Sequence, residues 1–113
     1  MFPDEALREG RDGGQGIHAG TVARPGEGRE DEFIRQWTER LAPTIQGLVP
    51  SARGTLVRSV ENRLLFYSFG PWKDVDEAST VRTSESVDEV IGEIRKLCEE
   101  ATPGVFEIIA EIG

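Results

Sequence analysis

The stretch that decides the fold is residues 53–69, RGTLVRSVENRLLFYSF. It contains two β-rich runs, Arg53 to Val60 and Arg63 to Phe69, and the pair Glu61-Asn62 separates them. Asparagine tolerates the left-handed backbone conformation that a tight turn requires. The stretch therefore predicts a β-hairpin with a two-residue connection.

The residues before this hairpin predict a strand and then a helix. Ile17 to Ala23 is a short run of small and β-branched residues that ends at a Pro-Gly turn, which is typical of a strand. Apolar residues then recur at spacings of three and four, which predicts one buried helix face: Phe33, Ile34, Trp37, Leu41, Ile45 and Leu48. Pro43 cannot donate a backbone hydrogen bond, so we expect a kink or an end near Ala42.

The residues after the hairpin predict two helix starts and a last strand. Asp74 to Glu77 and Ser86 to Glu89 each place a capping residue three positions before a glutamate. The second start leads into an apolar stripe at helical spacing, closed by Thr102-Pro103-Gly104: Val87, Val90, Ile91, Ile94, Leu97, Cys98 and Ala101. Val105 to Ile112 alternates as a strand does.

The order strand, helix, strand, strand, helices, strand predicts the split βαβ arrangement of the α+β ferredoxin-like fold. We expect residues 17–113 to form this single domain, behind a Gly-rich polar tail at residues 1–16. Helices can cover only one face of such a sheet. The hairpin gives the other face either Leu64, Phe66 and Ser68 or Leu65, Tyr67 and Phe69. Both sets are apolar, which predicts a homodimer that packs through this sheet face.

Composition excludes several classes of partner. The chain has 13 Lys and Arg against 21 Asp and Glu, a net charge of −8, which argues against nucleic acid and anionic membrane surfaces. One cysteine and one histidine cannot build a typical zinc or iron site within one subunit, so we expect no metal. The single cysteine also excludes an internal disulfide, and no apolar run is long enough to span a membrane. A cytoplasmic location is the expectation.

Three pieces of sequence occur in a fixed order, and together they resemble one family. They are Pro25-Gly26 through Glu30-Asp31-Glu32-Phe33, then Ser68-Phe69-Gly70-Pro71-Trp72 before a capped helix, then Gly104-Val105-Phe106-Glu107. From about Ile17 to Gly113 the chain resembles the antibiotic biosynthesis monooxygenase family. The resemblance implies a dimeric α+β barrel with a pocket between the sheet and the helices of each subunit. It also implies cofactor-independent monooxygenases of anthrone-like or quinol substrates, haem-degrading enzymes, and members without an established activity.

The haem-degrading branch fits this sequence poorly. That branch is similar in having a Trp at the end of the third strand, which is Trp72 here, but its histidine ligand falls at or near Ile91. Its first-strand Asn falls near Ala19 or Thr21. Isoleucine cannot donate a lone pair to iron, so haem binding would depend on His18, which is the only imidazole.

We select three candidate catalytic residues. Trp72 can stack on a flat ring and donate a hydrogen bond, although a Trp at a strand end also serves as a core lid. Tyr67 lies in the same predicted strand and could face either the pocket or the dimer interface. His18 is the only histidine of the chain, and imidazole is the usual side-chain base at neutral pH, although a partly exposed interface position fits His18 as well.

The candidate substrate-binding residues are Trp72, Arg58 and Trp37. Arg53 and Arg58 lie on opposite faces of the predicted strand, and whichever faces the helices could bind an anionic substrate oxygen. Trp37 lies on a helical apolar stripe, where core packing is the competing role.

The sequence thus predicts a monooxygenase that uses molecular oxygen and no cofactor on a small electron-rich aromatic or quinol compound. The alternative is a non-catalytic dimer that binds an aromatic metabolite. No second acid–base residue accompanies His18, which favours this alternative. Haem binding is a third reading.

Overall fold

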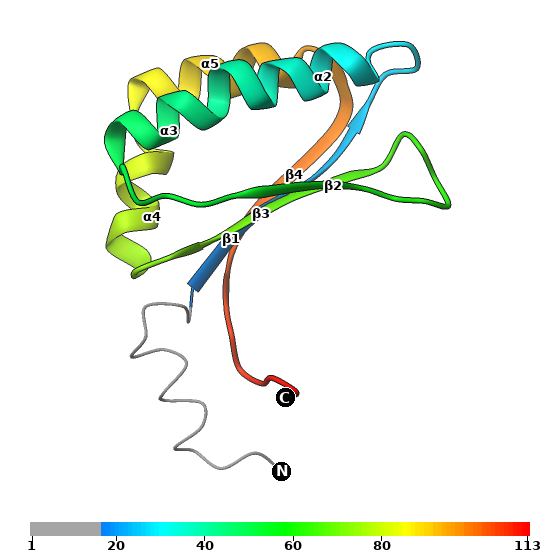
Figure 1. Ribbon diagram of the computed structural model, residues 1–113. Helices are drawn as coiled ribbons and strands as arrows, with labels where there is room; N and C mark the ends of the chain where they lie inside the picture. The colour runs from blue at the N-terminus through cyan, green and yellow to red at the C-terminus, as the bar shows by residue number, and fades with distance from the viewer. Residues whose placement is uncertain (1–16) are drawn as a thin grey trace.

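The computed structural model describes residues 17–113 and shows helices on one face of a four-stranded antiparallel sheet (Figure 1). The predicted tail, residues 1–16, lies outside the described part of the chain. The sheet order is β2-β3-β1-β4, which confirms the predicted ferredoxin-like fold. The elements in chain order are β1 (Ile17–Pro25), α2 (Glu30–Gln36), the π-helix η2 (Trp37–Leu41), α3 (Ala42–Leu48), β2 (Thr55–Arg58), β3 (Phe66–Trp72), α4 (Val75–Arg82), α5 (Glu85–Arg95) and β4 (Cys98–Glu107).

Of the predicted kink or end near Ala42, the end is wrong, because the first helical region continues past Pro43, and the helix changes from π-helical to α-helical geometry at Ala42. Residues 37–41 adopt π-helical geometry directly before α3, and Pro43 lies in the first turn of α3. A proline in a first turn removes an amide that has no partner within its own segment. A turn of π-helix therefore accommodates the proline, and the apolar stripe stays on the sheet side.

The hairpin forms, but its turn is longer than predicted. Thr55 pairs with Phe69 and Arg58 with Phe66, so residues 59–65 make the connection. The Ser59 hydroxyl accepts hydrogen bonds from the Glu61 and Asn62 amides, at 3.2 and 3.0 Å. These local side-chain bonds replace the ladder that a two-residue turn would have allowed.

The last helix and strand both begin earlier than predicted. The N-cap of α5 is Ser84, not Ser86, whereas the predicted cap of α4 is confirmed by Asp74, which accepts from the Glu77 amide at 2.8 Å. Helix α5 ends at Arg95, and the part of the predicted stripe from Cys98 to Ala101 belongs to β4. Residues 98–107 pair along β1, so the predicted strand at 105–112 is displaced towards the N-terminus.

Two buried clusters hold the helices on the sheet. One joins β1, β3, α2 and α5 through Ala23, Phe33, Phe66, Val90 and Ile94. The other joins the end of β3 to α4 and the start of α5 through Trp72, Ala78, Val81 and Val87. Of the two predicted hairpin sets, Phe66 and Ser68 face the helices, and Tyr67 and Phe69 face away from them.

Candidate functional site

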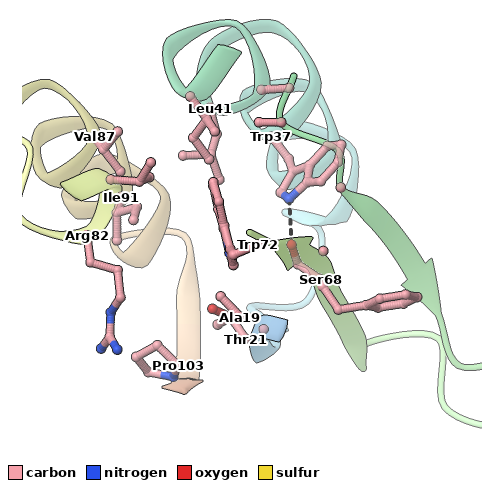
Figure 2. A pocket seen from close by; sticks show the side chains of 18 of the residues that line it. Ala19, Thr21, Trp37, Leu41, Ser68, Trp72, Arg82, Val87, Ile91 and Pro103 are labelled. Carbon is pink, nitrogen blue, oxygen red and sulfur yellow. Dashed lines mark hydrogen bonds between the residues drawn. The ribbon is translucent and has the colours of Figure 1, made fainter. Parts of the chain in front are cut away.

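A pocket of about 260 Å³ lies between the sheet and the helices of the chain (Figure 2). Residues of β1, β3 and β4 and of the segment before β2 contribute to it, and α3, α4, α5 and the π-helix η2 cover it on the helix side. Most of its wall is apolar. Its side-chain wall includes Trp37, Leu41, Ile45, Trp72, Val81, Val87, Ile91 and Pro103.

The π-helix places two of these side chains. Trp37 and Leu41 are its first and last residues, and both line the pocket. The Trp37 indole nitrogen donates a 2.9 Å hydrogen bond to Ser68 Oγ on β3 (Figure 2). Because Ser68 Oγ already accepts this bond, its own hydrogen remains available to an acceptor in the pocket.

A second hydroxyl lies beside that of Ser68. Thr21 on β1 is paired with Ser68 in the sheet register, and both residues line the pocket. Paired residues of an antiparallel sheet point to the same face, with Cβ atoms about 5 Å apart. Two hydroxyls therefore stand together on an otherwise apolar floor.

Trp72 is the last residue of β3 and lines the pocket four positions after Ser68. Its ring lines the pocket and is only 8% exposed, and Leu41 packs near it (Figure 2). Its Nε1 is buried and has no hydrogen-bond partner among residues 17–113. A buried N–H without a partner is destabilising, so this group is not explained by folding alone.

The charged residues that line the pocket within residues 17–113 are Arg53 and Arg82, with no carboxylate among them. Asp and Glu outnumber Lys and Arg 21 to 13 in the whole chain, so this local excess of positive charge runs against the composition. Arg53 precedes β2, and Arg82 is the last residue of α4. Neither forms an ion pair with any residue that the structure describes.

The two predicted acid–base residues lie outside this pocket. His18 stands between Ile17 and Ala19, which pack on the helix side, so its side chain points to the other face of the sheet. Tyr67 is 38% exposed on that same face, where its ring stacks on Phe69 at a centroid distance of 5.0 Å. Strand alternation thus separates both residues from their own chain's pocket.

Of the two predicted arginines, Arg58 lies on the helix side of the sheet but outside the pocket, and Arg53 is among the residues that line the pocket. The Arg58 guanidinium lies over the Phe66 ring, 4.7 Å from its centroid, and Arg58 does not line the pocket. Arg53 does line it. Both predicted tryptophans, Trp37 and Trp72, are brought together there.

Sequence reasoning missed Ser68, Thr21 and Arg82 as pocket residues. In the sequence, Ser68 stands out only as the first residue of the SFGPW motif. No local pattern marks Arg82, because its place in the pocket depends on how helix α4 packs on the sheet.

The pocket does not suit haem iron. Its lining among residues 17–113 contains no His, Cys, Met or Tyr, which are the residue types that hold haem iron in proteins. His18, the only histidine, points away.

Comparison with known proteins identifies the fold. No protein-family profile matches the sequence, and no curated protein is similar to it. Among solved structures, SnoaB of Streptomyces nogalater, a cofactor-independent oxygenase, is similar with a TM-score of 0.72 and 15% identity. The likeness covers 87% of this chain and 97% of SnoaB. The chain has the fold of the antibiotic biosynthesis monooxygenases.

Two further solved structures are similar to this chain over most of its length. One antibiotic biosynthesis monooxygenase has a TM-score of 0.68 at 12% identity, covering 83% of this chain and 99% of the other. A conserved Bacteroides thetaiotaomicron protein of unknown function has a TM-score of 0.69 at 17% identity, with coverage of 84% and 99%.

Within residues 17–113, no helix is both long and apolar enough to cross a membrane.

Proposed function

We propose that the chain is a cofactor-independent monooxygenase that binds a flat, electron-rich aromatic or quinol compound in this pocket. The observation that carries the proposal is a largely apolar pocket with two indole rings in its wall and a hydroxyl, that of Ser68, whose hydrogen is free to bind a substrate oxygen. The oxygenase activity of SnoaB, which shares the fold, supports the reaction type.

The proposed reaction needs little from the protein. In an anthrone-like substrate, a ring CH₂ group and one O₂ become a C=O group and one water molecule. The substrate anion gives one electron to O₂, and the substrate radical and superoxide combine to a peroxide anion. This anion takes up a proton from solvent to give a hydroperoxide, which loses water to leave the C=O group. Ser68 would donate to the substrate oxygen that carries the negative charge, and Thr21 stands beside it as a second donor.

The apolar wall would serve the same reaction by excluding water. Hydrogen bonds to a developing anion are stronger in such a site than in water. Trp72 and Trp37 would hold the ring plane through their indole faces. The proton that the substrate loses would pass to solvent, because the described lining contains no carboxylate, imidazole or phenol.

This lack of a base favours the second candidate, a non-catalytic dimer that binds an aromatic metabolite. The two functions share the pocket and differ only in whether oxygen is consumed.

Oxygen uptake with a panel of anthrones and quinols distinguishes them. We expect uptake above the uncatalysed rate in the wild type and a loss of about 100- to 1,000-fold in Ser68→Ala, the range seen when one anion-binding donor is removed. Ser79→Ala on the exposed surface of α4 is the matched control and should not change the rate. No uptake across the panel, with ligand binding retained, would leave the non-catalytic binder.

We also propose that two copies associate through the bare sheet face. Several large apolar side chains of this face are exposed in the single chain, among them Val22 at 46%, Val57 at 42% and Phe106 at 55%. Exposed apolar groups gathered on one face favour association, and a two-fold axis would cover both copies at once. His18 and Tyr67 would then lie at the interface.

A further inference from the structure

Two arginines line the pocket: Arg53, from the segment before the edge strand β2, and Arg82, from the end of α4, whose side chain extends towards the other edge strand, β4. Arg53 lies beside β3, since a Cβ added at Gly70 would be 2.2 Å from the Arg53 carbonyl oxygen. Figure 2 shows Arg82 extending from α4 towards Pro103 on β4. The sheet order puts three strand spacings between these edges, roughly 14 Å.

We propose that the natural ligand is an aromatic acid whose carboxylate, remote from the reacting ring, is bound by Arg82. The proposal rests on the proposed function, because it assigns the substrate class to the same pocket. Arginine matches a carboxylate with two parallel N–H donors, which gives both orientation and affinity.

Arg82 is better placed for this role than Arg53. Its neighbour Val81 is 3% exposed in the second cluster, and the helix that carries both begins at the Asp74 cap. The Arg82 backbone is therefore held by the packing of a capped helix, whereas Arg53 lies outside any helix or strand. A fixed backbone lowers the entropy that a side chain loses when it binds a ligand.

The ring would then reach inwards from Arg82. Val87, Ile91 and Trp72 form the apolar surface next to it, and Ser68 and Thr21 lie further along the floor (Figure 2). An acid group at one end and a reacting oxygen at the hydroxyl pair would fix the ligand in one direction. Arg82 would thus select and orient the substrate, while Ser68 and Thr21 would bind the oxygen of the ring that is oxidised.

The two tryptophans make this proposal simple to test. The chain has two Trp residues, and both line the pocket, so quenching of tryptophan fluorescence reports on this site. The probes are anthraquinone-2-carboxylate and the neutral 2-(hydroxymethyl)anthraquinone, which share the ring system. Their affinities are compared in wild type, Arg82→Gln, Arg82→Lys and Arg53→Gln, with Arg95→Gln on the exposed end of α5 as the matched control.

We expect the wild type to bind the carboxylate about tenfold more tightly than the neutral probe, and this preference to weaken with added salt. Arg82→Gln should reduce the preference to about twofold or less while the neutral probe binds as before, and Arg82→Lys should restore part of it. Arg95→Gln should keep the full preference.

Equal affinity for the two probes in the wild type would overturn the proposal while leaving the pocket as a ligand site. Loss of the preference in Arg53→Gln but not in Arg82→Gln would overturn it as well, by placing the acid at the other end. Binding of neither probe would contradict the proposed function together with the acid selectivity.

Discussion

The indole nitrogen of Trp37 and the hydroxyl oxygen of Ser68 are joined by a 2.9 Å hydrogen bond across 31 positions of the chain. The bond links the π-helix to the third strand and lies in the wall of the pocket. It fixes one indole ring and leaves one hydroxyl hydrogen for a ligand. A structural contact and the proposed anion-binding donor are therefore the same group.

This bond predicts that the stability cost of Ser68→Ala depends on whether Trp37 is present. Ser68→Ala leaves the partly buried Trp37 N–H without its acceptor, and we expect it to lower the free energy of unfolding by about 1–3 kcal/mol. In the Trp37→Phe background the same Ser68→Ala change should cost less, because no donor is stranded. Urea denaturation of the four proteins measures this coupling, and simple additivity of the two changes would contradict it.

Trp72→Phe should separate stability from binding. It removes a buried N–H that has no partner among residues 17–113, which offsets part of the cost of the smaller ring. We expect the free energy of unfolding to change by only about 1 kcal/mol, against about 3–5 kcal/mol when a buried aromatic is truncated to alanine. Affinity for aromatic ligands should fall several-fold, and calorimetry of unfolding and of binding provides both values. Strong destabilisation would show that the ring is required mainly for the core.

Gly70 should tolerate no side chain. An added Cβ would be 2.2 Å from the Arg53 carbonyl oxygen, which is backbone and cannot move aside. We expect Gly70→Ala to destabilise by ~3 kcal/mol or more. At Gly92 in α5 an added Cβ would have no atom within 4 Å, so Gly92→Ala should stabilise by about 0.5–1 kcal/mol through helix propensity. Thermal unfolding of both variants checks the contrast, and equal effects would contradict the close approach of β3 to Arg53.

Cys98 predicts a loss of stability at alkaline pH. Burial raises the pKa of the Cys98 thiol above its ordinary value, so the unfolded chain loses the thiol proton at a lower pH than the folded chain. The contribution is complete below the unfolded pKa and is lost as pH rises through the folded pKa. The stability of the wild type relative to Cys98→Ser should therefore fall across this window. A constant difference between the two proteins from pH 7 to 10.5 would contradict the burial effect.

The proposed dimer predicts a different outcome for two similar substitutions. Val57 lies on the bare sheet face and is 42% exposed, whereas Val60 lies in the following loop and is 86% exposed. A lysine at position 57 would place a charge in the interface, so Val57→Lys should shift the protein to monomer at micromolar concentration. Val60→Lys should not. Sedimentation equilibrium measures both, and a monomeric wild type would contradict the dimer directly.

The predicted boundary between the last helix and the last strand is wrong for a specific physical reason. The apolar stripe of α5 continues through Cys98 and Ala101, and local spacing alone supports a longer helix. Pairing with β1 satisfies the backbone groups of residues 98–107, so the chain leaves the helix at Arg95. Such long-range pairing is invisible to a local pattern.

What the sequence by itself determined is the order of the elements, the buried faces of the helices and the presence of Trp72 at the end of β3. These features depend on local periodicity and capping, which neighbouring residues set. Only the tertiary structure decided which side of the sheet Tyr67 and His18 occupy, because both alternating sets of β3 are apolar and the helices can cover only one. It also decided that Ser68 and Arg82 share a pocket, since a cavity exists only where segments distant in the chain fail to fill the space between them.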